Sequence, residues 1–110
     1  MKISNQRTNE IINFINNLSL DKKYKNEFSK EKIKNILYIN ESLTHSSANH
    51  EINYENLEFL GDAVLRLIAS DFIKAKFPNM EVGERSELRS HLVSDQWLED
   101  VGEKIGIKSV

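Results

Sequence analysis

The chain of 110 residues is too short for more than one domain, and we expect residues 1–110 to form a single small core. Apolar residues make up 39% of it and charged residues 29%, which excludes a disordered composition. The absence of cysteine excludes disulfides, thiolate metal sites and a cysteine nucleophile. No apolar run approaches the roughly 18 residues that span a bilayer, and the first residues lack a secretory signal. We therefore expect a cytoplasmic protein without membrane contact.

The net charge is −2, but the two halves of the chain differ. Residues 1–50 carry eight Lys and Arg against five Asp and Glu, whereas residues 51–110 carry seven against twelve. A protein that holds nucleic acid by charge alone is usually basic. Two interpretations stay open: the charge is ordinary for a soluble domain, or bound metal ions neutralise the acidic half when nucleic acid binds.

Scarce glycine and proline, with no strand-like alternation, predict an all-α fold. The spacing of apolar residues predicts a first helix over about 8–18. We expect the charged segment 21–26 to be a loop. Ser29 can cap a second helix, which carries apolar residues between 33 and 39. The polar segment 43–50 is then expected to be a helix end followed by a turn.

The longest predicted helix covers about residues 54–77 and is apolar nearly all round, which is typical of a buried central helix. Pro78 ends it, because proline cannot continue a helix. A shorter helix over about 83–93 follows. Ser94 is predicted to cap the last helix, and Gly106 is placed to end that helix in a left-handed conformation.

Three carboxylates form a stripe on the long predicted helix. Glu55, Glu58 and Asp62 are spaced i, i+3 and i+7, so they fall within an arc of roughly 60°. Half-buried carboxylates are costly unless they are paired or bind a cation. Mg²⁺ prefers oxygen ligands and usually takes one or two protein carboxylates. Two other interpretations stay open: Arg66 pairs with Asp62, or the stripe is the solvated edge of the helix.

The order of residues around these carboxylates is more specific than their spacing. Residues 53–65, Asn-Tyr-Glu-Asn-Leu-Glu-Phe-Leu-Gly-Asp-Ala-Val-Leu, resemble the signature motif of the ribonuclease III family. The Leu-Thr-His-Ser-Ser-Ala segment at 43–48 resembles the family's upstream segment. Residues 83–94 resemble its downstream segment, with a basic residue at Arg89 and the Leu-Val-Ser ending. The resemblance covers about residues 36–107 and implies the helical ribonuclease III endonuclease-domain fold.

The resemblance also implies roles for individual residues. Glu58 and Asp62 match the family's first pair of active-site acids, with Glu58 a direct metal ligand and Asp62 acting through metal-bound water. Glu55, which we group with these catalytic acids, matches a position tied to RNA engagement and dimer geometry. Phe59 matches a residue that family dimers insert into the partner subunit; ordinary core packing is its alternative. Gly61 fits a place where the partner approaches closely.

The function implied by the resemblance is endonucleolytic cleavage of double-stranded RNA in RNA processing. Mg²⁺, with Mn²⁺ as a possible substitute, polarises the phosphate and lowers the pKa of the attacking water. The products carry 5′-phosphate and 3′-hydroxyl ends. A homodimer presents two such sites to the two strands. Recognition rests on A-form shape and on contacts to 2′-hydroxyls and phosphates.

The sequence departs from the family's pattern in its acidic residues. The family needs a second pair, Asp-x-x-Glu, on a later helix, which the sequence up to Val110 does not show. Asp100 and Glu103 have this spacing, but the family's acidic helix comes later, so we interpret them as a solvated helix face. Val82 and Ser46 stand where many relatives carry an acidic and a basic residue, which puts an accessory metal contact and a phosphate contact in doubt.

These departures shape the expected activity. We expect a ribonuclease III fold that is incomplete at its C-terminus and lacks a double-stranded RNA-binding domain. The chain by itself is expected to be inactive or weak as an enzyme, because two helices supply the metal ligands in the family. The alternative function is a catalytically incomplete ribonuclease III-like module for RNA binding or dimerisation.

Overall fold

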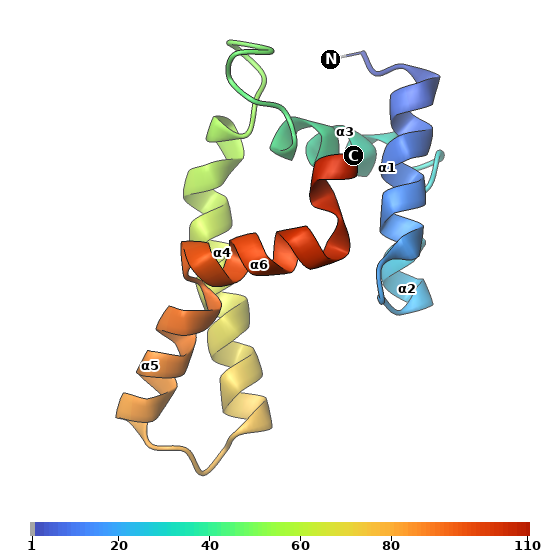
Figure 1. Ribbon diagram of the computed structural model, residues 1–110. Helices are drawn as coiled ribbons and strands as arrows, with labels where there is room; N and C mark the ends of the chain where they lie inside the picture. Colours follow the sequence, from blue (N-terminus) through green and yellow to red (C-terminus); the bar gives the residue numbers. More distant parts are fainter. Residues whose placement is uncertain (1) are drawn as a thin grey trace. The chain divides into compact units, whose positions relative to one another are not determined.

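The computed structural model describes residues 2–110, and this part of the chain is helical with no strand, which confirms the all-α prediction. Figure 1 shows the helices in chain order: α1 (Asn5–Asn17), α2 (Lys22–Lys25), α3 (Ile33–Ser42), α4 (Glu55–Lys76), α5 (Val82–Leu92), α6 (Asp95–Ile105) and the 3-10 turn η1 (Ile107–Ser109). None of the helices within residues 2–110 combines the length and the hydropathy of a membrane-spanning helix.

The chain divides into two compact units. The first runs to Leu57 and includes Ser109 and Val110, and the second covers Glu58–Lys108. Each unit is described by itself below. That residues 1–110 form one domain stays a prediction.

The core of the first unit lies between α1 and α3. Ile11 and Ile15 from α1 meet Ile36 from α3, and all three are buried. Burying an isoleucine side chain contributes about 1.5–3 kcal/mol, so this cluster is the main apolar contribution to the stability of the unit. A polar contact fixes the same pair of helices, because Arg7 Nε donates to Asn40 Oδ1 at 3.0 Å.

The first predicted helix is confirmed as α1, but it begins earlier than the apolar pattern indicates. Ser4 is its N-cap, and the Ser4 hydroxyl accepts a hydrogen bond from the Arg7 backbone N–H at 3.1 Å. The Thr8 hydroxyl donates to the Ser4 carbonyl at 3.0 Å. A serine cap satisfies a free N–H group of the first turn, so α1 starts directly after Ser4.

The expectation of a loop over 21–26 is wrong, because α2 lies inside this segment. The helix is a single turn, closed by a hydrogen bond from Asn26 N–H to the Lys22 carbonyl at 3.0 Å. A contact beyond the turn holds it: Lys25 Nζ donates to the Asn16 carbonyl at 2.9 Å. A helix this short has no apolar periodicity, so the sequence pattern does not reveal it.

The expectation that Ser29 caps the second predicted helix is also wrong. The helix is α3, whose N-cap is Lys32, and no side chain caps it. The Ser29 carbonyl instead accepts from Lys32 N–H at 3.0 Å, which forms a turn before the helix. The carboxyl of Glu31 accepts from its own backbone N–H and from the Ser29 hydroxyl, and these hydrogen bonds lower its pKa. Ser29 therefore acts within the turn.

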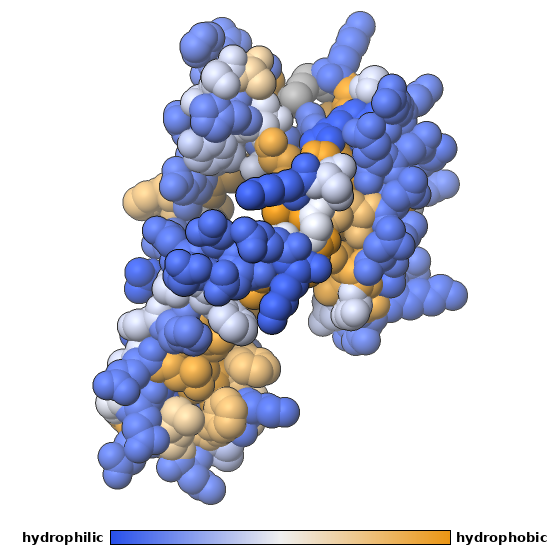
Figure 2. Space-filling view, in the orientation of Figure 1, coloured by the Kyte–Doolittle hydropathy of each residue, from blue (hydrophilic) through white to orange (hydrophobic). Residues whose placement is uncertain are grey.

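The prediction of a buried central helix over about 54–77 is wrong in its burial but right in its extent. On α4 only Ala69 and Ile73 are buried. The large apolar side chains along the rest of the helix are exposed: Phe59, Leu60, Val64, Leu67, Ile68 and Phe72. A helix that is apolar nearly all round needs neighbours on several faces, and α5 contacts one face of its C-terminal half. Figure 2 shows apolar surface gathered over the α4–α5 hairpin.

The predicted helix ends are confirmed in the second unit. α4 ends at Lys76, just before Pro78. The helix predicted over 83–93 is α5, shifted by one residue. The Ser94 hydroxyl caps α6 by accepting from Trp97 N–H at 3.2 Å. Gly106 ends α6 with a φ of 74°, the left-handed conformation that glycine adopts without strain.

Asn53 organises the turn that precedes α4. Its side chain is 2% exposed, and its Oδ1 accepts from the Glu55 backbone N–H at 2.9 Å. Its Nδ2 donates to the carbonyls of Asn49, at 2.8 Å, and His50, at 3.3 Å. One buried amide thus satisfies a free N–H group of α4 and two loop carbonyls. The predicted helix end and turn over 43–50 are confirmed, and Asn53 connects this turn to the helix.

Replacing Asn53 with alanine is expected to lower the free energy of unfolding by about 1–3 kcal/mol. The change removes the acceptor for Glu55 N–H and leaves two loop carbonyls without their donor. Urea unfolding followed by circular dichroism measures the loss. The matched control is Asn56→Ala, because the exposed Asn56 amide makes one hydrogen bond, to the Glu51 carbonyl at 2.9 Å. Equal losses in the two variants would show that Asn53 has no special role.

Candidate functional site

The three predicted acids lie at the start of α4. Glu55, Glu58 and Asp62 are all exposed, and the helix runs unbroken through them. Because residues four apart on a helix are neighbours, Glu58 and Asp62 lie one turn apart on the same face. The stripe expected from the sequence is therefore present on a solvated surface. The argument that it is costly because it is half-buried fails, since these carboxylates keep their contact with water.

Asp62 has a partner on its own helix. Arg66 Nε lies 3.5 Å from Asp62 Oδ2, with the two side chains 57% and 64% exposed, respectively. The alternative in which Arg66 pairs with Asp62 is thus realised. Within residues 2–110 Glu58 forms no ion pair. An exposed i, i+4 pair contributes only about 0–1 kcal/mol, so a divalent cation can replace Arg66 at little cost.

The two carboxylates are the donors that this face of α4 offers to a metal ion. Across the described part of the chain, no group of three or more His, Cys, Asp or Glu side chains could hold a metal ion. Mg²⁺ usually keeps several water ligands and takes one or two protein carboxylates. Glu58 and Asp62 fit this requirement for a hydrated ion that is held weakly. Their role as metal ligands stays a prediction, as does the role of Glu55.

Phe59 is not a core residue, because its side chain is 91% exposed. The alternative of ordinary core packing is therefore wrong. Leu60 and Leu67 on the same helix are exposed as well, so Phe59 belongs to a wider apolar face. At Gly61 an added Cβ would meet no atom within 4 Å, so no contact within the chain requires glycine there. The insertion of Phe59 into a partner and the close approach at Gly61 stay predictions.

Asp100 and Glu103 lie on α6, and both are exposed. Asp100 Oδ1 accepts a hydrogen bond from Gln96 Nε2 at 3.1 Å, a contact along the helix surface. This placement agrees with their interpretation as a solvated helix face.

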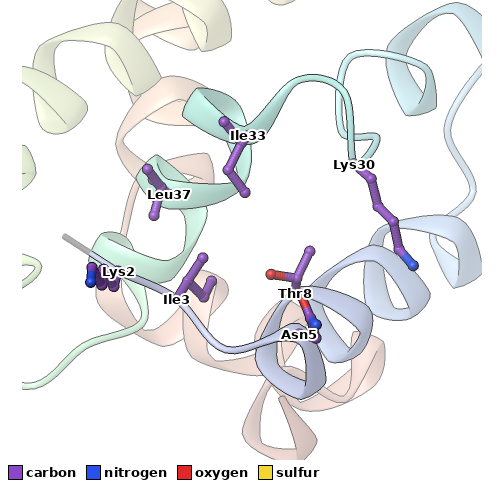
Figure 3. Close-up of a pocket in the computed structure, with 7 residues that line it drawn as sticks. All are labelled: Lys2, Ile3, Asn5, Thr8, Lys30, Ile33 and Leu37. Atoms are coloured by element: carbon purple, nitrogen blue, oxygen red, sulfur yellow. The ribbon is translucent and has the colours of Figure 1, made fainter.

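A hollow of about 410 Å³ lies in the first unit, but it contains none of the predicted site residues. Figure 3 shows Asn5 and Thr8 from α1 and Ile33 and Leu37 from α3 around it. The remaining lining residues are Lys2, Ile3 and Lys30. With no carboxylate or histidine among them, this hollow offers a metal ion no carboxylate or imidazole ligand.

Comparison with protein families identifies the family of this chain. Residues 34–110 match a family model described as Ribonuclease-III-like. The chain belongs to the ribonuclease III family. This confirms the resemblance seen in the sequence. The matched segment contains α4 to α6, all of α3 but its first residue, and all of the predicted site residues.

Individual ribonuclease III relatives match nearly the whole chain. Ribonuclease 3 of Prochlorococcus marinus is 47% identical over 107 residues, which are 97% of this chain and 43% of that relative. Ribonuclease 3 of Borreliella burgdorferi is 37% identical over 112 residues, 97% of this chain and 41% of that relative. The chain thus spans less than half the length of these curated relatives. No solved structure matches the chain.

Asn53 is the residue whose role the sequence analysis missed. It is the first residue of the family's signature motif here, and its amide holds the turn from which α4 starts. A signal was available, because asparagine just before the start of a predicted helix is a capping signal. The acids of this ribonuclease III motif thus follow directly after the residue that sets where their helix begins.

Proposed function

We propose that the chain acts as a ribonuclease III-type endoribonuclease domain that cleaves double-stranded RNA by metal-dependent hydrolysis. The observation that carries the proposal is the Glu58–Asp62 pair, exposed one turn apart on α4 inside the segment that matches the family. The curated relatives are named ribonuclease 3, which supports the reaction class. A cytoplasmic location stays a prediction.

The pair would hold Mg²⁺, or Mn²⁺ in its place. Glu58 supplies a carboxylate without an ion-pair partner, so it is free to bind the ion directly. Asp62 would supply a second carboxylate once Arg66 turns away, and it would orient water there. Glu55 lies one turn before Glu58 and contributes to RNA engagement. When bound, the ion neutralises phosphate charge and activates water for in-line attack.

Charge is a second reason to involve a cation. Residues 51–110 carry twelve Asp and Glu against seven Lys and Arg, so this half of the chain repels a phosphate backbone unless positive charge is added. A divalent ion at the acidic stripe adds that charge where the phosphate must approach. Recognition of double-stranded RNA by A-form shape requires few base contacts and suits a surface of this kind.

One carboxylate pair positions the ion incompletely. Glu58 and Asp62 come from a single helix turn, so they would hold an ion with carboxylates from one helix only. A displacement of about 1 Å in a reacting group can cost roughly 100-fold in rate. We therefore propose that the chain of 110 residues by itself cleaves RNA slowly.

Incubation of the purified chain with double-stranded RNA and Mg²⁺ is expected to give slow cleavage with 5′-phosphate ends, at least about 100-fold below a full-length ribonuclease 3. Asp62→Asn, which replaces an exposed carboxylate and should leave the fold intact, is expected to abolish this cleavage. Gel analysis of end-labelled RNA measures both rates.

Cleavage that is equal in wild type and Asp62→Asn would contradict the proposal and favour the RNA-binding or dimerisation module. Rapid cleavage would show that a second acidic pair lies within the chain, and Asp100 and Glu103 would be the first residues to replace.

We also propose that the apolar face of α4 is a two-fold interface with a second copy of the chain. Phe59 is the most exposed large apolar residue of that face, which continues through exposed Leu60, Val64 and Leu67. Contiguous apolar surface of this kind is typical of an association site. A two-fold interface brings the same patch of both subunits together, so one side chain acts twice.

Phe59→Ala is therefore expected to weaken self-association by about 10-fold or more, because each dimer loses two buried aromatic side chains. Sedimentation velocity across the micromolar range measures the dissociation constant. Val82→Ala is the control, since Val82 is apolar and 77% exposed but lies on α5. Wild-type chain that stays monomeric over the whole range would rule out this interface.

A further inference from the structure

A second hollow, lined by cationic side chains, lies between α4 and α5 in the second unit. Its volume is about 250 Å³. The lining residues are Ser70, Ile73 and Lys74 from α4, and Val82, Arg85, Ser86 and Arg89 from α5. Three cations line the hollow and no carboxylate does. The proposed metal pair is not part of it.

The three cations lack a counter-ion in the described part of the chain. Within residues 2–110, none of Lys74, Arg85 and Arg89 forms an ion pair. Arg85 and Arg89 are four residues apart, so they lie on the same face of α5. Like charges brought together without a partner repel each other, and the repulsion is relieved when an anion enters.

The hydrogen bonds of the two arginines leave donors available. Arg85 Nη2 donates to the Pro78 carbonyl at 2.6 Å, but its Nε is buried without a partner. Arg89 Nη1 donates to Ser70 Oγ at 3.1 Å, and Ser70 donates in turn to the Arg66 carbonyl at 2.8 Å. Both guanidinium groups are therefore held in place by neutral partners. A buried N–H without an acceptor is unfavourable, and a ligand oxygen would satisfy it.

We propose that this hollow binds a phosphate group. Guanidinium groups present several N–H donors in a fixed plane, which matches the oxygens of a phosphate, and Lys74 adds a mobile ammonium group. The hydroxyls of Ser70 and Ser86 line the same hollow and supply neutral donors. The proposed site binds and positions the phosphate and takes no part in a covalent step.

The phosphate is assigned to the backbone of RNA. Ile73 lies eleven residues, or about three helical turns, after Asp62, so this lining residue falls within about 20° of Asp62 around α4, whereas Ser70 and Lys74 lie about 80° and 120° from it. Ser70 lies about 12 Å from Asp62 along the helix axis, at 1.5 Å per residue. An RNA strand that reaches Asp62 can therefore place a neighbouring phosphate in the hollow. This assignment rests on the proposed function, whereas the phosphate site itself rests on the α4–α5 contacts.

The first arm of the test uses inorganic phosphate. Arginine Nε–H signals of ¹⁵N-labelled chain are followed by NMR during titration with phosphate, and with chloride at equal ionic strength. The Arg85 and Arg89 signals are expected to shift saturably with phosphate and not with chloride. Lys74→Gln should weaken binding several-fold, and Arg89→Gln should weaken it by about 10-fold. Lys76→Gln, the matched loss of one exposed charge outside the hollow, should leave it unchanged. Arg85 is kept because it holds the turn at Pro78.

The second arm uses a short double-stranded RNA in EDTA, where no cleavage occurs. Arg89→Gln is expected to weaken RNA binding by about 10-fold and to lower the slope of affinity against salt by about one, whereas Lys76→Gln should have little effect. Phosphate binding without an effect on RNA would overturn the assignment to RNA and leave a site for a small phosphate ligand. Signals that do not respond to phosphate would overturn the site. Intact RNA binding with no Asp62-dependent cleavage in Mg²⁺ would overturn the proposed function alone.

Discussion

The unbroken course of α4 through Glu58 and Asp62 is the constraint on which the rest of the site depends. With 3.6 residues per turn, a spacing of four brings the two carboxylates to one face, and inserting a single residue between them would rotate them apart by about 100°. The start of this helix is fixed by Asn53, whose buried amide accepts from Glu55 N–H and donates to two loop carbonyls. The hydrogen bonds of Asn53 thus set where the helix that carries Glu58 and Asp62 begins.

Different faces of α4 carry different kinds of side chain. Its acidic stripe faces water and offers two carboxylates. Exposed apolar side chains lie beside the stripe, as Phe59 does, and further round the helix, as Leu67 does. Further along, Ala69 and Ile73 are buried, and Ile73 lines the cationic hollow between α4 and α5. By our proposals, the carboxylates would hold a metal ion and the hollow would hold a phosphate of the same RNA. The exposed apolar directions remain available for a second subunit.

Much of the fold could be predicted because its helix ends are marked by local chemistry. Ser94 and Gly106 were identified from the sequence alone, since a serine cap and a left-handed glycine each depend on a few neighbouring residues. The short helix α2 and the turn at Ser29 were missed, because one helical turn has no periodicity and a serine hydroxyl can bond within a turn instead of capping. The burial of α4 was predicted wrongly for a different reason. The apolar pattern predicts which faces of the helix can pack against other helices, whereas burial depends on whether such helices lie there. The placement of Glu58 and Asp62 on one face followed from their spacing. The sequence could not show whether Asp62 forms an ion pair with Arg66, because this depends on the positions of the two side chains.

The central claim is that the exposed Glu58–Asp62 pair is a metal site, and paramagnetic relaxation by Mn²⁺ tests it most directly. Mn²⁺ added to the ¹⁵N-labelled chain is predicted to broaden the backbone signals around residues 58 and 62 first, at concentrations consistent with a weakly held ion. Glu58→Gln is predicted to remove this broadening, because it removes the carboxylate that has no competing cation. Broadening that begins elsewhere, for example at Asp100 and Glu103 on α6, or that persists unchanged in Glu58→Gln, would contradict the account.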